Sequence, residues 1–120
     1  MKNYVQPGDT IEVSAAAAAV DSGDLIVIGS HLAVANHGAA VGEPFNAKLS
    51  GVFELPKVAG AAWTRGQQLM WDSSAGAFVA VGATSAGDVT GAGATAWEPA
   101  LAAATVGLVR LAGIPGTVAA

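Results

Sequence analysis

The chain has 120 residues, a length that predicts a single domain spanning residues 1–120. Its five Lys and Arg residues against nine Asp and Glu residues give a net charge of −4, so we expect no basic patch of the kind that binds DNA or RNA directly. The lack of cysteine excludes disulfides and thiolate metal sites.

The first part of the chain predicts short strands separated by turns. We expect residues 1–8 to form an N-terminal arm, and Thr10–Val13 alternates apolar and polar side chains as a short strand does. Leu25–Ile28 is apolar throughout and rich in β-branched residues, which predicts a strand buried on both faces. Gly29-Ser30 predicts a tight hairpin turn that leads into a further strand, His31–Ala35.

The run of alanines at residues 15–19 is too short to nucleate a helix on its own. We expect it to be a closely packed strand extension or loop, in a place where only methyl groups fit.

The clearest alternation in the chain lies at residues 44–56, between two prolines. One parity is apolar and the other is mostly polar, which predicts a central strand with one buried face, or a bent pair of strands with the bend at Gly51. The apolar parity holds Phe45, Ala47, Leu49, Gly51, Phe53 and Leu55.

The second half continues the pattern of short elements. Residues 61–65 predict one helical or 3₁₀ turn that ends at a glycine, and residues 67–81 predict a β-hairpin. Residues 84–95 are rich in Gly, Ala, Ser and Thr and predict a loop, whereas residues 105–111 predict the last strand. The small residues of 112–120 predict a flexible tail.

Taken together, the elements predict an all-β fold, a small sandwich or barrel of about seven short strands with at most one short helical turn. No long amphipathic helix separates the strands, as a parallel βαβ arrangement would require. Alanine and glycine account for 28 and 16 residues, so the core is thin, and small β domains with thin cores often gain stability by forming oligomers.

The sequence offers no arrangement of residues that is typical of catalysis or of a cofactor site. His31 and His37 are the only histidines, and their spacing matches no zinc motif. No serine lies in a nucleophile elbow, and no glycine-rich loop has the ending of a phosphate-binding loop. We therefore expect no enzyme activity, no cofactor and no metal. Tyr4 and Trp97 lie outside the clear strands and are candidates for contact with a second subunit or a partner, since Tyr and Trp are favoured at interfaces.

The opening residues 1–11, Met-Lys-Asn-Tyr-Val-Gln-Pro-Gly-Asp-Thr-Ile, resemble the start of a family of small tailed-phage and prophage proteins designated DUF2190. The resemblance continues through residues 42–44, through Gly-Val-Phe-Glu-Leu-Pro-Lys at residues 51–57 and through Leu-Met-Trp-Asp at residues 69–72, and it ends in the strand around Arg110. The segment of residues 84–104 departs from the family pattern, because it is longer than expected and richer in Gly and Ala.

Members of this family resemble capsid decoration, or cement, proteins. The resemblance implies a structural virion protein on the capsid exterior, made in the host cytoplasm, that binds the major capsid protein as a homo-oligomer, a homotrimer, and stabilises contacts between capsid subunits. It implies no direct contact with nucleic acid, and no apolar run approaches the ~20 residues that span a membrane. We place the partner interface on the arm and one tryptophan: Lys2, Asn3, Tyr4, Val5, Gln6, Pro7 and Trp97.

Two questions stay open at this point. The chain could instead be a phage head-fibre or a receptor- or carbohydrate-binding β module without catalytic activity, which would need an exposed aromatic platform. The arm at residues 2–7 could reach a neighbouring molecule by strand addition or by docking of Tyr4, or it could simply begin the first strand.

Overall fold

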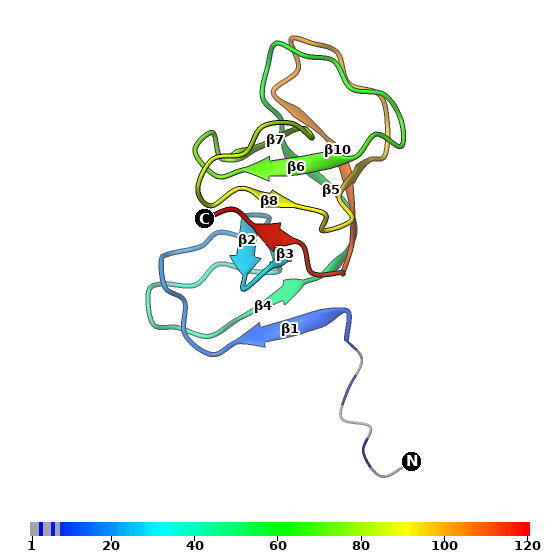
Figure 1. Cartoon of the computed structure of the whole chain (residues 1–120). Coiled ribbons are helices and arrows are strands. Elements are labelled where there is room, and N and C mark those ends of the chain that lie inside the picture. The colour runs from blue at the N-terminus through cyan, green and yellow to red at the C-terminus, as the bar shows by residue number, and fades with distance from the viewer. Residues whose placement is uncertain (1–2, 4–5, 7) are drawn as a thin grey trace.

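The computed structural model describes residues 3, 6 and 8–120, which form eleven strands in three antiparallel sheets (Figure 1). In spatial order, the first sheet contains β1 (Thr10–Val13), β4 (Phe45–Lys48), β3 (His31–Ala35) and β2 (Leu25–Ile28). The second contains β5 (Ser50–Pro56), β10 (Val106–Ala112) and β9 (Thr95–Ala96). The third contains β11 (Thr117–Val118), β8 (Val89–Thr90), β6 (Leu69–Asp72) and β7 (Ala77–Ala80).

The all-β class is confirmed, and the described part of the chain contains no helix. The seven expected strands are present, with the segment of residues 44–56 divided into β4 and β5. The additional strands β8, β9 and β11 have two residues each, which is too short for any periodicity to register in the sequence.

The segment of residues 44–56 connects the first sheet to the second. Its first part is β4 and its second part is β5, so the bent pair of strands is the correct alternative. Gly51 has φ +134°, a conformation that other residues rarely adopt, and it lies just after the point where the chain changes sheets. Figure 1 shows β4 leading into β5, which runs beside β10 along one side of the molecule.

The strand β2 lies at the edge of the first sheet, so the prediction that it is buried on both faces is wrong. Val27 is 38% exposed, and the other three residues of β2 are half-buried. The neighbouring strand β3 has a partner on each side and is the buried one. The hairpin between them is confirmed, because Ile28 pairs with His31 across Gly29-Ser30. An apolar run marks a strand here but not its place in the sheet.

The run of alanines is a loop against one face of the first sheet. Ala16 is buried, its N–H donates to the carbonyl of Glu43, and its carbonyl accepts from the N–H of Gly42. The other four alanines of residues 15–19 are exposed, so close packing is found at Ala16 alone.

Residues 61–65 do not form the expected helical turn. Trp63 instead pairs with Ala100 through two backbone hydrogen bonds of 3.1 Å, and its indole is buried. The helix propensity of two alanines is worth a few tenths of a kcal/mol, less than the burial of a large aromatic side chain. Packing against a distant segment therefore outweighs local propensity.

The tail also differs from the expectation, because residues 112–120 return to the sheet. Thr117–Val118 pairs with β8, the N–H of Gly116 donates to Ser30, and Ala119 exchanges hydrogen bonds with Gly87 and Asp88. The small residues make this approach possible, since a Cβ on Gly116 would collide with the carbonyl oxygen of Thr90.

Apolar side chains form two clusters on opposite faces of the first sheet. The larger lies between the first sheet and the other two, and its most deeply buried side chains are Phe78, Leu55, Leu111, Val89 and Val109. The smaller contains Phe45, Ala33 and Ala47 and extends to Ala16 of the alanine loop. Each face of the first sheet therefore carries an apolar cluster of its own.

Among the residues that the structure describes, two charged side chains are buried. Asp88 accepts hydrogen bonds from the N–H of Ser73 at 3.1 Å and from the N–H of Ser85 at 2.9 Å. Lys57 donates to the carbonyls of Val58 and Ala104, and its ammonium group lies 5.6 Å from the centre of the Trp63 ring. Both groups are compensated as buried polar groups must be, so neither needs a ligand to explain it.

Candidate functional site

The side of the β5–β10–β9 sheet that faces away from the core gathers apolar residues at the surface. Strand alternation directs Leu55, Val109 and Leu111 into the core, so the residues between them point outward. We call these outward residues, with those at β9, the outer face: Val52, Glu54, Pro56, Val106, Leu108, Arg110, Thr95 and Trp97.

The strand register fixes how the outer face is arranged. Leu108 lies opposite Glu54 on β5, and its carbonyl accepts the N–H of Trp97 at 2.9 Å on the other side. Val52, Trp97 and Val106 are 42%, 48% and 48% exposed, and they are three of the nine large apolar residues exposed in the described part of the chain. Together they make the outer face a candidate contact surface.

An open groove of about 360 Å³ lies at the β9 side of the outer face. Its lining is Arg65, Gly66, Thr95, Ala96, Trp97, Glu98 and Arg110. An exposed indole beside two guanidinium groups is typical of protein–protein contacts, where Trp and Arg are enriched. The lining contains no nucleophile paired with a base.

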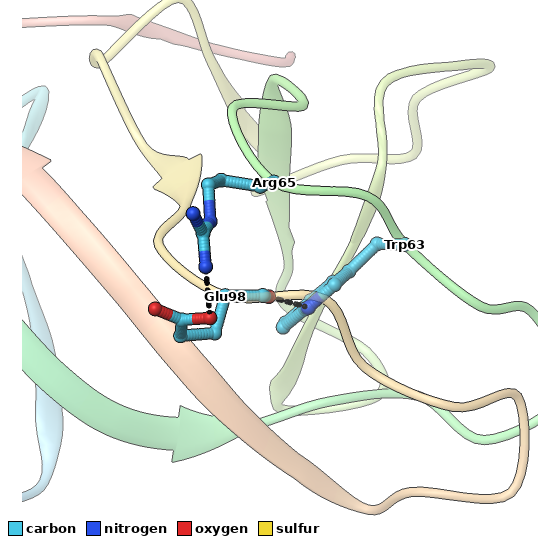
Figure 2. A network of polar contacts seen from close by, with 3 residues as sticks. All are labelled: Trp63, Arg65 and Glu98. Atoms are coloured by element: carbon cyan, nitrogen blue, oxygen red, sulfur yellow. Dashed lines mark hydrogen bonds and ion pairs between the residues drawn. The ribbon is translucent and has the colours of Figure 1, made fainter.

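Glu98 lines the groove, and Figure 2 shows that Trp63 and Arg65 both contact it. The Nε1–H of Trp63 donates to the carbonyl of Glu98 at 3.1 Å, and Nη2 of Arg65 lies 2.6 Å from Oε2 of Glu98. The indole is buried, whereas the ion pair is exposed and contributes little to stability. The indole contact therefore anchors this part of the groove.

The buried position of Trp63 depends on a glycine in β10. A Cβ on Gly107 would collide with the six-membered ring of Trp63. The same alternation that points Leu108 outward thus directs Gly107 inward, where it makes room for the indole that holds Glu98.

Both arginines of the chain line the groove, but they differ in whether a charged partner is present. Arg65 pairs with Glu98, whereas Arg110 forms no ion pair with any residue that the structure describes. Glu54 likewise has no ion-pair partner among the described residues. Arg110 lies opposite Val52 on β5, and Val52 is two residues from Glu54. Glu54 is therefore the diagonal neighbour of Arg110, and the Cα atoms of such neighbours are roughly 7–8 Å apart. The outer face therefore carries one unpaired charge of each sign.

Four of the seven residues predicted for the partner interface, Lys2, Tyr4, Val5 and Pro7, lie outside the described residues. Asn3 and Gln6 are exposed, and Gln6 lines a separate shallow pocket at β1 that shares no residue with the groove. Trp97 is exposed at the groove. The structure therefore places Trp97 at the groove and does not join it to Asn3 or Gln6.

Sequence reasoning did not identify Glu54 and Arg110 as members of the same surface. The chain has only two arginines, and both lie beside residues 95–98 in space. The sequence does not show this, because the position of Arg110 depends on the pairing of β10 with both β5 and β9.

Across residues 3, 6 and 8–120, no three His, Cys, Asp or Glu side chains gather as a metal site would need. The same residues include no helix of the length and apolar character needed to cross a bilayer.

Comparison with known proteins gives a match to a family model. The model is described as "Phage cement protein", and it matches residues 5–111, which include every strand except β11 and the last residue of β10. No curated protein matches the chain significantly.

Proposed function

Because the chain belongs to the phage cement protein family, which supports a role in capsid decoration, we propose that it binds the outside of a phage head and stabilises contacts between major capsid subunits. The observation that carries this proposal is the family match over residues 5–111. The outer face adds a physical basis, because it offers exposed apolar and arginine side chains for contact with another protein. In this role the protein works by binding, with no catalytic step.

The proposed mechanism is multivalent clamping by a homotrimer on the capsid exterior. An oligomer that touches several capsid subunits at once makes its later contacts intramolecular, so weak individual contacts add up to firm retention. A capsid subunit that is held by its neighbours through the clamp then dissociates more slowly.

The test uses heads of the encoding phage that lack this protein. Purified protein is added, the heads are pelleted, and the bound amount and the temperature at which the heads release DNA are measured. We expect saturable binding and a higher release temperature. Failure to bind at concentrations well above those present during infection would refute the proposal.

We also propose that the N-terminal arm takes part in binding, by strand addition or by docking of Tyr4. Deletion of residues 2–7 is then expected to weaken binding to heads. A variant in which those residues are replaced by Gly and Ser controls for length. Head binding that is unchanged by the deletion would remove the arm from the mechanism.

A second candidate function, a carbohydrate-binding module of a head fibre, is favoured by one observation, the exposed indole of Trp97 beside an open groove. Sugar rings stack on exposed aromatic faces, and the polar groups of Arg65 and Glu98 could bond to hydroxyls. A glycan array distinguishes the two functions. Binding to glycans that is lost in Trp97→Ala, together with no binding to heads, would favour the carbohydrate module.

A further inference from the structure

The outer face carries an unpaired base and an unpaired acid among apolar side chains, and we propose that it binds a second copy of this chain. In this contact Arg110 of one copy pairs with Glu54 of the next. The inference rests on the proposed homo-oligomer and names the surface through which its subunits meet.

The charges of the outer face are complementary to those of a second copy. Glu54 and Arg110 belong to adjacent strands but form no ion pair with each other. A neighbouring copy offers each of them the partner that the described part of its own chain does not supply. Buried between protein surfaces, such a pair is an Arg–carboxylate contact, which is stronger and more directional than an exposed one.

The apolar residues explain why the contact favours association. Val52, Leu108 and Val106 lie in adjacent rows beside the two charges, and Trp97 flanks Leu108. Arginine and aromatic side chains are enriched at protein interfaces, and here they lie among aliphatic ones. Covering Val52, Val106 and Trp97 would remove three exposed large side chains from water.

The distribution of charge favours a second copy over an unrelated charged partner. With the adjoining groove, the outer face holds two arginines and two glutamates, so it is neutral as a whole. The remainder of the chain holds seven carboxylates and three lysines, so it carries an excess of negative charge on balance. Two copies can approach with least repulsion where the face is neutral and apolar.

The experiment exchanges the two charges. Arg110→Glu, Glu54→Arg and the double variant are compared with the wild type by sedimentation velocity over a range of concentrations at physiological salt. We expect the wild type to self-associate, and each single variant to have a dissociation constant about tenfold or more higher because like charges then meet. The double variant is expected to return to within about threefold of the wild type, because opposite charges face each other again.

Two controls separate this contact from general effects. Glu12→Arg makes the same charge change as Glu54→Arg at an exposed position on β1, which belongs to another sheet and whose pocket shares no residue with the outer face, and we expect it to leave association unchanged. Mixing the two single variants in equal amounts is expected to recover association at least in part, because Arg of one again meets Glu of the other. Thermal unfolding of each variant verifies that it is folded.

The outcomes are distinct from those of the proposed function. A wild type that stays monomeric, or single variants that associate as the wild type does, would overturn the inference. Single variants that associate normally but no longer bind heads would also overturn it and would assign the outer face to the capsid. Rescue by the double variant in a protein that ignores heads would support the subunit contact while refuting capsid decoration.

Discussion

At the scale of single residues, Asp88 is the side chain whose chemistry the fold depends on most directly. One of its carboxylate oxygens accepts from the backbone and hydroxyl of Ser73, and the other accepts from the N–H of Ser85. Asp88 therefore ties the turn between β6 and β7 to the loop that precedes β8. It lies in a stretch that the sequence predicts only as a loop, because no local pattern shows that a turn aspartate will be buried.

We expect Asp88→Ala to destabilise the protein by about 2–3 kcal/mol, because it leaves backbone N–H groups without an acceptor in a buried place. The measurement is the free energy of unfolding from urea titration. Ser73→Ala removes only the hydroxyl bonds to Asp88 and to the carbonyl of Ala86, so it is the matched control and should cost less than about 1 kcal/mol. Equal losses in the two variants would contradict this account.

Asp72 gives the protein a pH-dependent contribution to stability. Hydrogen bonds from the Ser74 hydroxyl, from the Ala75 N–H and from the Ser74 N–H lower the pKa of the Asp72 carboxyl. Because the folded pKa lies below the unfolded one, the stabilisation is fully present above the unfolded pKa and is lost as the pH falls through the folded pKa.

The test is the difference in melting temperature between the wild type and Asp72→Asn as a function of pH. We expect the wild type to be the more stable at pH 7, and the difference to shrink as the pH is lowered below the ordinary range for Asp. A difference that stays constant from pH 7 to pH 2 would show that the charge of Asp72 does not contribute.

At the scale of elements, β11 is the strand whose removal is most informative. It pairs with β8, and the residues beside it hydrogen-bond Ser30, Gly87 and Asp88. Deletion of residues 116–120 should therefore destabilise the protein by about 2–4 kcal/mol, at roughly 1 kcal/mol for each lost hydrogen bond. Circular dichroism melting measures the loss, and Val118→Ala, which alters an exposed side chain without touching the backbone pairing, is the control. Unchanged melting after the deletion would mean that the segment behaves as the flexible tail that its composition suggests.

The elements also show what a sequence can and cannot predict. β1, β2 and β3 have the predicted bounds, and the hairpins at Gly29-Ser30 and between β6 and β7 follow from local turn residues. Whether β2 is central or at an edge depends on which strands pair across the chain, and periodicity carries no such information. The outer face depends on the same long-range pairing, because Glu54 and Arg110 meet only through the register of β5 with β10.

At the scale of the whole molecule, folding and association should be linked. If copies associate through the outer face, each folded copy acts as a ligand for another folded copy. Association then stabilises the folded state, and the stability rises with protein concentration. We expect the melting temperature of the wild type to increase between micromolar and hundred-micromolar protein. Arg110→Glu should show a smaller increase, and a wild-type melting temperature that is independent of concentration would contradict the link.

The alternation along β10 has a practical consequence. Residues 107, 109 and 111 face the interior, whereas residues 106, 108 and 110 face outward. Substitutions at the outward positions should therefore change binding with little effect on the packing of the core. A library randomised at these outward positions alone should yield folded molecules with altered partner preference, which makes this short stretch a natural starting point for engineering new attachments.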